Sequence, residues 1–137
     1  MRIGIIGSMQ STEKTYEIYD ELKKQNHDSY LTDLAEPFIG RTDEEKERIK
    51  IYQKNNLGVI KKFWNFMQDR NAVLVVNLTR KEIENYIGSD TFLEAGFACI
   101  LNQKIFLYDL VPEIDLYKTE IVAVQSIILN EDLIKIK

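Results

Sequence analysis

Residues Ala72 to Val76, AVLVV, decide the fold class that this sequence predicts. The run is continuously apolar and lacks the alternation of polar and apolar side chains found in half-solvated strands. A strand buried on both faces is typical of a parallel sheet covered by helices. Arg2 to Gly7, RIGIIG, is a second run of this kind and ends in glycine. We therefore expect both segments to be buried strands of one parallel sheet.

The segments around these two strands alternate between helix and strand patterns. A capping box of Thr42 and Glu45 predicts a helix start, and Asn55-Asn56 and Gly58 are expected to bend or split the helix that follows. Residues 112–120 form a predicted loop with room for a short helix, and the last residues can add one turn. The predicted strands are 2–7, 29–33, 72–76, 104–108 and 126–129, and the predicted helices are 12–25, 42–67 and 89–102.

This alternation predicts a single α/β domain over residues 1–137. We expect three α/β/α layers around a five-stranded, doubly wound parallel sheet of order 2-1-3-4-5, flavodoxin-like or Rossmann-like. Ligands of such sheets bind outside the carboxyl ends of the strands, where the strand order reverses. The predicted site therefore lies in the loops after the first and third strands.

Composition limits the class of partner. The chain has 137 residues and a net charge of -4, which argues against a general nucleic-acid binder. Lys and Arg nevertheless cluster between Arg41 and Lys62, where they could form a small basic patch. One histidine, His27, and one cysteine, Cys99, argue against a His/Cys metal site, and Cys99 is expected in the core. We expect no metal and no cofactor.

The amino-terminal segment predicts a strand and not a secretion signal. MRIGIIGS contains only a short apolar run, which leads directly into polar residues. No apolar run in the chain reaches the ~18 residues that span a bilayer. We therefore expect a cytoplasmic protein without membrane contact.

The loop after the first strand contains Gly7, Ser8 and Met9. Its backbone N–H groups and the Ser8 hydroxyl could hold a phosphate at the start of the next helix. An ordinary turn with a serine cap is the alternative, since neither standard nucleotide fingerprint is present. Asp33, Asn77 and Asp109 lie at or near other strand ends, where they either line the cleft or serve the turns.

The segment Asn85 to Ala98, NYIGSDTFLEAGFA, predicts a loop that opens an apolar helix. Asp90 and Glu94 are the only acidic residues from 90 to 103, where Lys and Arg are absent, so we expect a helix buried on most sides. Gly96 costs up to ~1 kcal/mol inside a helix and suggests close approach of a strand, a subunit or a ligand. In one interpretation, Thr91 and Glu94 form a capping box.

In the other interpretation, Glu94 takes part in chemistry. A carboxylate near a helix amino terminus is expected to stay ionised, because the helix dipole favours negative charge. An ionised carboxylate in a semi-enclosed cleft is suited to attack on an anomeric carbon. Tyr86, in the preceding loop, could stack on a base or simply pack on the surface.

Four segments together resemble the nucleoside 2-deoxyribosyltransferase-like superfamily, in particular its small bacterial and archaeal members. They are IGIIGSM, AVLVVN, GSDTFLEAGFA and NQKIFL, in that order, and the resemblance that they mark extends over nearly the whole chain. The resemblance implies that the glutamate of an E-x-G-x-A helix start attacks the anomeric carbon of a deoxynucleoside or deoxynucleotide. Glu94, Gly96 and Ala98 match that motif.

The resemblance also implies roles for the other positions. Gly7, Ser8 and Met9 would line the sugar or 5′-phosphate pocket, and Asp90 would be the acidic residue ahead of the glutamate. The enzymes usually have an aspartate near the end of the central strand, where this chain has Asn77. An amide can hydrogen-bond a base but cannot protonate it. Ser89 replaces the second glycine of the close relatives.

Three functions follow as hypotheses. The first is a nucleoside or nucleotide N-glycosidic-bond enzyme, a 2-deoxyribosyltransferase or hydrolase, that forms a covalent glycosyl-glutamate. The second is an inactive nucleotide-binding or sensor module, and the third is an interaction protein whose apolar helix is a dimer interface. A phosphoribohydrolase would need a PGG motif that the chain lacks. We expect a nucleoside or nucleotide ligand and a homodimer or higher homo-oligomer. The predicted catalytic residues are Glu94 and Asp90, and the predicted substrate-binding residues are Gly7, Ser8, Met9, Asn77, Tyr86 and Gly88.

Overall fold

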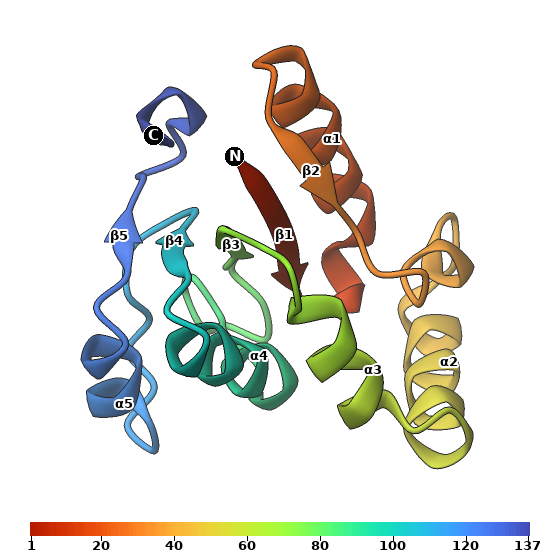
Figure 1. The fold of residues 1–137 in the computed structure, drawn as a ribbon. Coiled ribbons are helices and arrows are strands. Elements are labelled where there is room, and N and C mark those ends of the chain that lie inside the picture. Colours follow the sequence, from red (N-terminus) through yellow and green to blue (C-terminus); the bar gives the residue numbers. More distant parts are fainter.

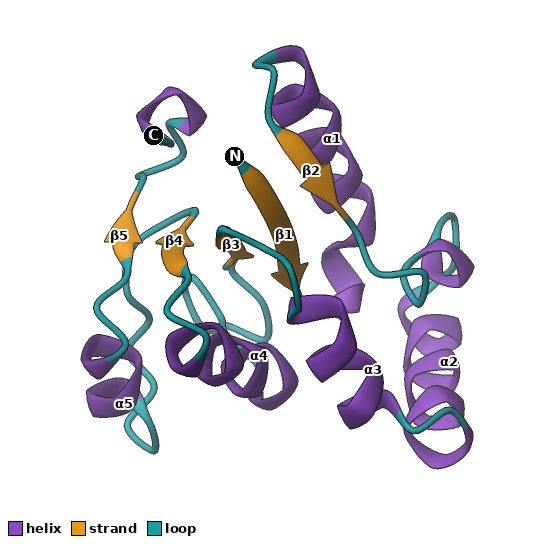
Figure 2. Ribbon diagram, in the orientation of Figure 1, coloured by secondary structure: helices purple, strands orange, loops and turns teal.

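The computed structural model describes all 137 residues, and its centre is a five-stranded parallel sheet with helices on both faces (Figure 1, Figure 2). The strands lie in the order β2-β1-β3-β4-β5. Both the predicted α/β fold and its strand order are therefore confirmed. The strands are β1 (Arg2–Gly7), β2 (Asp28–Tyr30), β3 (Ala72–Val76), β4 (Lys104–Leu107) and β5 (Ile127–Ile128).

The helices begin and end largely where local signals predicted. Thr42 and Glu45 form the capping box, each side chain accepting the other residue's backbone N–H. Gly58 has a φ of +58°, a left-handed conformation that divides the predicted 42–67 helix in two. The helices are α1 (Thr12–Lys24), α2 (Asp43–Asn56), α3 (Val59–Met67), α4 (Ser89–Ile100) and α5 (Lys118–Ala123), and the short 3₁₀ turns are η1 (Met9–Ser11), η2 (Glu36–Phe38) and η3 (Leu133–Lys135).

Both faces of β3 are buried, which explains its unbroken apolar run. Ala72, Leu74 and Val76 pack on one face against residues of α1 and the carboxyl terminus. Val73 and Val75 pack on the opposite face against residues of α3, α4 and α5. Since successive strand side chains point to opposite faces, an apolar residue is needed at every position of this strand.

Strands β1 and β3 approach closely at their carboxyl ends. Gly7 pairs with Val76, and a Cβ atom built on Gly7 would lie 3.0 Å from the Val76 carbonyl oxygen. A side chain at position 7 would therefore force these strands apart. The glycine is explained by sheet packing, and it holds the loop that follows β1 close to the end of β3.

The edge strands are shorter than predicted. Strand β2 covers 28–30 in place of 29–33, and β5 covers 127–128 in place of 126–129. Each edge strand pairs with one neighbour only, so fewer of its residues are held in the ladder. The short helix α5 begins at Lys118 and extends beyond the predicted loop of residues 112–120.

Helix α4 is less buried than its composition predicted. It buries Thr91, Glu94, Ala95 and Ala98, whereas Leu93, Cys99 and Ile100 are exposed. The predictions of a helix buried on most sides and of a core cysteine are therefore wrong. The helix packs on the sheet with one face only, and its apolar residues extend around the other. A Cβ built on Gly96 meets no atom within 4 Å, so nothing in this chain approaches it closely.

None of the helices has both the length and the apolar character required to span a membrane.

Candidate functional site

A cleft opens at the carboxyl ends of β1 and β3, where the strand order reverses. It encloses about 640 Å³ of empty space, its open mouth included. The structure brings together there all the predicted catalytic and substrate-binding residues except Asn77. The lining residues are Gly7, Ser8, Met9, Leu34, Lys50, Gln53, Lys54, Val59, Phe63, Arg80, Tyr86, Gly88, Ser89, Asp90, Thr91 and Glu94.

Glu94 lies in the most buried part of the cleft among its ionisable residues. The residue is 7% exposed, and its carboxyl group takes part in none of the hydrogen bonds or ion pairs of the structure. The amino-terminal cap of α4 is Gly88, and no side chain caps that end. The capping-box interpretation of Thr91 and Glu94 is therefore wrong, and Glu94 has no structural partner that would account for its burial.

Burial changes the protonation of Glu94. Removal of the carboxyl from water, with a smaller contribution from the Asp90 charge, raises the pKa of Glu94 from 4.5 to about 8. The expectation of a carboxylate that stays ionised is therefore wrong, because a pKa of about 8 favours the protonated form at neutral pH. The favourable helix dipole acts near the first turn, and here desolvation outweighs it.

Asp90 links two walls of the cleft. Its carboxylate lies 2.8 Å from the Lys54 ammonium, so the ion pair joins the first turn of α4 to α2. Asp90 precedes Glu94 by one helical turn on the same side of α4. The side chains of Lys54 and Asp90 are 39% and 34% exposed, which places this pair nearer the mouth than Glu94.

The Ser8 hydroxyl has two roles at the end of β1. It accepts a hydrogen bond from the Gln10 backbone N–H at 3.3 Å and so caps η1. It also accepts one from the Arg80 guanidinium at 3.1 Å, which ties the loop after β3 to the loop after β1. The same guanidinium lies 5.9 Å from the centre of the Tyr86 ring. Ser8, Arg80 and Tyr86 thus form one edge of the cleft.

Gly88 provides room for Tyr86. A Cβ built on Gly88 would lie 3.3 Å from the Tyr86 ring. A substitution there would require the Tyr86 ring to shift by a few tenths of an ångström. Gly88 therefore stands where there is little room for a side chain, and Ser89 is the first residue of α4.

Sequence reasoning missed the wall that α2 and α3 provide. Lys50, Gln53 and Lys54 come from α2, and Gln53 donates a hydrogen bond to the Leu34 carbonyl at 3.1 Å. The concentration of Lys and Arg between residues 41 and 62 was the available signal. It did not show which face of the helix meets the cleft. An apolar wall, Leu34, Val59 and Phe63, packs against Met9.

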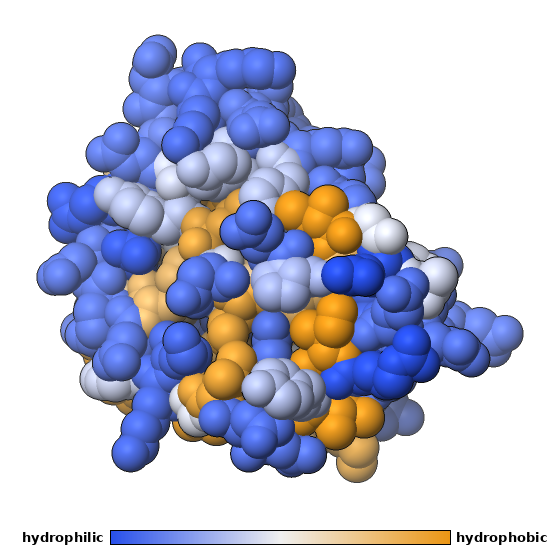
Figure 3. Space-filling model, turned by 90° about the vertical axis from the view of Figure 1, so that its right-hand side faces the viewer, coloured by the Kyte–Doolittle hydropathy of each residue, from blue (hydrophilic) through white to orange (hydrophobic).

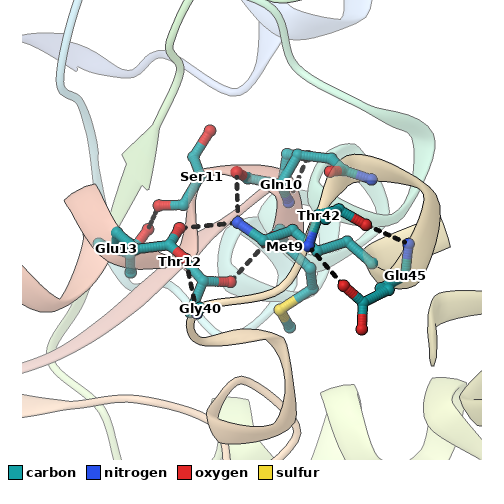
Figure 4. Close-up of polar contacts among 11 residues, drawn as sticks. Met9, Gln10, Ser11, Thr12, Glu13, Gly40, Thr42 and Glu45 are labelled. Carbon is teal, nitrogen blue, oxygen red and sulfur yellow. Dashed lines mark hydrogen bonds and ion pairs between the residues drawn. The ribbon is translucent and has the colours of Figure 1, made fainter.

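Polar contacts hold α2 in position. The Lys46 ammonium, whose side chain is 5% exposed, lies 2.7 Å from the Glu13 carboxylate and donates to the Gln10 carbonyl. Glu13 also accepts a hydrogen bond from the Gly40 backbone N–H (Figure 4). The Lys46 ammonium is the main cause that holds the pKa of Glu13 below its usual value. These bonds tie the start of α1 to the helix that supplies the cleft lysines.

Helix α2 buries polar side chains and exposes apolar ones. Its buried residues, Lys46 and Gln53, are polar, whereas Ile51 and Tyr52 are exposed. Figure 3 views the molecule from this side and shows apolar side chains among a polar surround. The attachment of α2 therefore depends on hydrogen bonds and ion pairs more than on apolar packing.

Asn77 lies outside the cleft. Its side chain is fully buried, donates to the Leu110 carbonyl and accepts from the Asp109 backbone N–H, both at 2.8 Å. It joins the end of β3 to the segment after β4, and in this structure it cannot contact a base in the cleft. Asp109 and Asp33 also lie outside the cleft. Asp33 is exposed, and its carboxylate lies 3.9 Å from the Lys62 ammonium.

The Asn77 contacts lead to a stability prediction. Asn77→Ala is expected to lower the free energy of unfolding by about 2–3 kcal/mol, because it removes both hydrogen bonds of a fully buried side chain and the link that they make between β3 and the segment after β4. Urea denaturation measures this change. Asn65→Ala, at an exposed position on α3, is the control and should stay within about 0.5 kcal/mol of the parent. Equal stability of both variants would contradict the structural role of Asn77.

No three side chains of His, Cys, Asp or Glu gather where they could hold a metal ion. Comparisons of the chain with models of known protein families, with curated proteins and with solved structures found no match.

Proposed function

We propose that this protein breaks the N-glycosidic bond of a nucleoside or nucleotide and that Glu94 is the nucleophile. The observation that supports this most strongly is a single unpaired carboxyl, Glu94, deep in a cleft at the strand-order reversal. The cleft also gathers Asp90, Tyr86 and the loop of residues 7–9. The resemblance of four sequence segments to the nucleoside 2-deoxyribosyltransferase-like superfamily supports the same proposal.

The proposed reaction has two displacements. In the first, a Glu94 carboxylate oxygen bonds to the anomeric carbon while the carbon–nitrogen bond to the base breaks. The electron pair of that bond leaves with the base nitrogen, which takes a proton from water. In the second, water or another base attacks the anomeric carbon and releases the carboxylate. This route requires Glu94 to lose its proton before it attacks.

The other cleft residues have supporting roles in this proposal. Asp90 orients the sugar hydroxyls or Glu94, Tyr86 and Gly88 border the base, and Gly7, Ser8 and Met9 border the sugar. A homodimer or higher homo-oligomer is part of the proposal. The apolar side chains that α4 exposes, Leu93 and Ile100, support it.

Base release tests the proposal directly. Ribonucleosides, deoxyribonucleosides and their 5′-monophosphates are incubated with the parent protein and with Glu94→Ala, with and without an acceptor base. Free base formed by the parent alone is the expected result. Base release by neither protein from any member of this panel would reject N-glycosidic chemistry.

The pKa of Glu94 leads to a prediction for the pH profile. We expect kcat/KM to rise about tenfold per pH unit up to about pH 8 and then to level off, because only ionised Glu94 attacks. Asp90→Asn should move the midpoint of the rise to lower pH, since the Asp90 charge contributes to the raised pKa. Rates measured across the alkaline and acid ranges test this. A profile with its maximum below pH 6 would contradict the nucleophile assignment.

A binding or sensor module without catalysis is the second candidate. Two features favour it: Asn77 does not reach the cleft, and burial raises the pKa of Glu94 to about 8, which disfavours the ionised nucleophile at neutral pH. Tight nucleotide binding without base release, at any pH up to about 9, would identify this function. An interaction protein is the third hypothesis, and it predicts no nucleotide binding at millimolar concentration.

A further inference from the structure

The mouth of the cleft gathers positive charge in an acidic protein. Lys50 and Lys54 are one turn apart on α2, and Arg80 lies across from them in the loop after β3. The only acidic lining residues are Asp90 and Glu94, and burial raises the pKa of Glu94 to about 8. With both acids ionised, the three lining cations still leave a formal charge of +1 in the cleft, whereas the chain has -4. The Glu47 carboxylate, which is not part of the lining, lies 2.7 Å from the Lys50 ammonium. The charge of the cleft lining is therefore opposite in sign to the net charge of the whole chain.

The cations and the buried carboxyl occupy different depths. The Lys50 and Lys54 side chains are 27% and 39% exposed, whereas Glu94 is 7% exposed. The lysines therefore lie nearer the mouth of the cleft than Glu94 does. An anionic group on a ligand that reaches Glu94 would remain at the mouth, where its hydration is only partly lost.

Cations from α2 and from the loop after β3 act on one carboxylate, that of Glu47. The Lys50 ammonium is the main cause that lowers the pKa of Glu47, and the charges of Lys81 and Arg80 lower it further. The loop of residues 80–81 thus approaches α2 across the mouth. Arg80 makes no ion pair and donates to the Ser8 hydroxyl, so its charge lacks a carboxylate partner. Lys54 has Asp90 as its partner at 2.8 Å, and Lys50 has Glu47 as its partner at 2.7 Å, so a ligand anion would compete with both carboxylates.

We infer that the substrate is a phosphorylated nucleotide and that its phosphate binds at the cleft mouth to Lys50, Lys54 and Arg80. A phosphate offers several oxygens to cations from different directions, and arginine and lysine both bind it through charge-assisted hydrogen bonds. The phosphate competes with Asp90 for Lys54, and the Ser8 hydroxyl adds a further donor. The inference rests on the proposed function for the reaction at Glu94, whereas the phosphate contacts can be tested without turnover.

Calorimetric titration tests the phosphate contacts. Each ribo- and deoxyribonucleoside and its 5′-monophosphate is titrated into the parent protein at one low ionic strength. For at least one base, the monophosphate should bind at least about tenfold more tightly than its nucleoside. Lys50→Gln, Lys54→Gln and Arg80→Gln should each weaken monophosphate binding about 5- to 10-fold. Binding of the nucleoside should change less than about twofold.

Two further variants sharpen the comparison. Lys61→Gln removes the same charge from an exposed position on α3 outside the cleft, and it should leave both affinities unchanged. Asp90→Asn frees Lys54 from its ion pair, and it should tighten monophosphate binding about two- to fivefold. A general effect of net charge would instead change Lys61→Gln and the mouth variants equally.

The outcomes separate this inference from the proposed function. Equal affinities for nucleosides and monophosphates, or no monophosphate binding at millimolar concentration, would overturn the phosphate assignment. Monophosphate preference without base release would uphold the assignment and reject the enzymatic proposal. Base release from nucleosides, with a monophosphate affinity no higher than the nucleoside affinity, would uphold the enzymatic proposal and reject the phosphate assignment.

Discussion

Glu94→Ala is expected to reduce base release at least about 1,000-fold at the pH where the parent is fastest. The nucleophile forms the bond that replaces the broken one, and no second carboxyl is available at its depth. Asp90, the other acidic residue of the cleft, is paired with Lys54 nearer the mouth. Initial rates of base formation, with substrate both limiting and saturating, measure the loss.

Controls separate this loss from damage to the fold. Glu84→Ala removes a carboxyl from an exposed loop position outside the cleft and should keep the parent rate. Glu94→Gln has nearly the shape of glutamate and should be as inactive as Glu94→Ala. Binding of nucleotide to both Glu94 variants should persist, since neither loses a mouth cation. A Glu94 variant with more than about a tenth of the parent rate would exclude a nucleophilic role.

A covalent adduct would distinguish a nucleophile from a group that only stabilises charge. Acid quenching of the parent during turnover should yield a peptide containing Glu94 that is heavier by one sugar residue, as mass spectrometry can detect. The same peptide from Glu94→Gln should be unmodified, because an amide does not form the ester. Turnover without any trace of the adduct would favour direct attack by water.

The second prediction with a large expected effect concerns stability. Replacement of Glu94, which should remove activity, should stabilise the fold above neutral pH. Glu94 has a pKa of about 8 in the folded chain and 4.5 as its ordinary value. Between these values the folded chain binds more protons than the unfolded chain, so the free energy of unfolding falls as pH rises. The group's contribution should decrease by about 3 kcal/mol between pH 5 and pH 8. Glu94→Gln does not titrate and should lack this decrease.

Urea denaturation of the parent and of Glu94→Gln at several pH values measures the difference. The variant should be more stable than the parent by a margin that grows from pH 5 to pH 8 and then levels off. Glu84→Gln, at an exposed position, should follow the parent at every pH. Parallel curves for the parent and Glu94→Gln would show that the carboxyl is well hydrated and that its pKa is ordinary.

Together these effects would show that Glu94 is retained at a cost in stability. A substitution that improves the fold above neutral pH and removes activity is typical of a residue selected for chemistry. If the Glu94 variants were both more stable and unchanged in nucleotide binding, with no base release in the parent, the sensor hypothesis would gain support.

The sequence predicted well those features that depend on neighbouring residues. The bounds of β3, the helix start at Thr42 and the break at Gly58 all follow from periodicity, capping or one backbone conformation. The alternation of elements then led to the strand order, because parallel connections leave few arrangements. The cleft at the strand-order reversal followed from that order.

Other predictions failed because they concern distant contacts. Asn77 lies at a strand end, as predicted, but the segment after β4 takes both of its hydrogen-bonding groups. Cys99 is in an apolar helix, yet the helix packs with one face only. Helix composition shows how apolar an element is, and the neighbours packed around it determine which residues are covered.

By itself, therefore, the sequence determined the succession of helices and strands, the sheet order and the edge of the sheet at which the cleft lies, since local spacing and chain connectivity govern these. Only the tertiary structure decided that Glu94 is buried without a partner, which raises its pKa to about 8, and that Lys50, Lys54 and Arg80 line the same cleft. The physical reason is that desolvation and Coulomb interactions depend on distance in space. Ser8 and Arg80, which are 72 residues apart in the chain, are hydrogen-bonded in the fold.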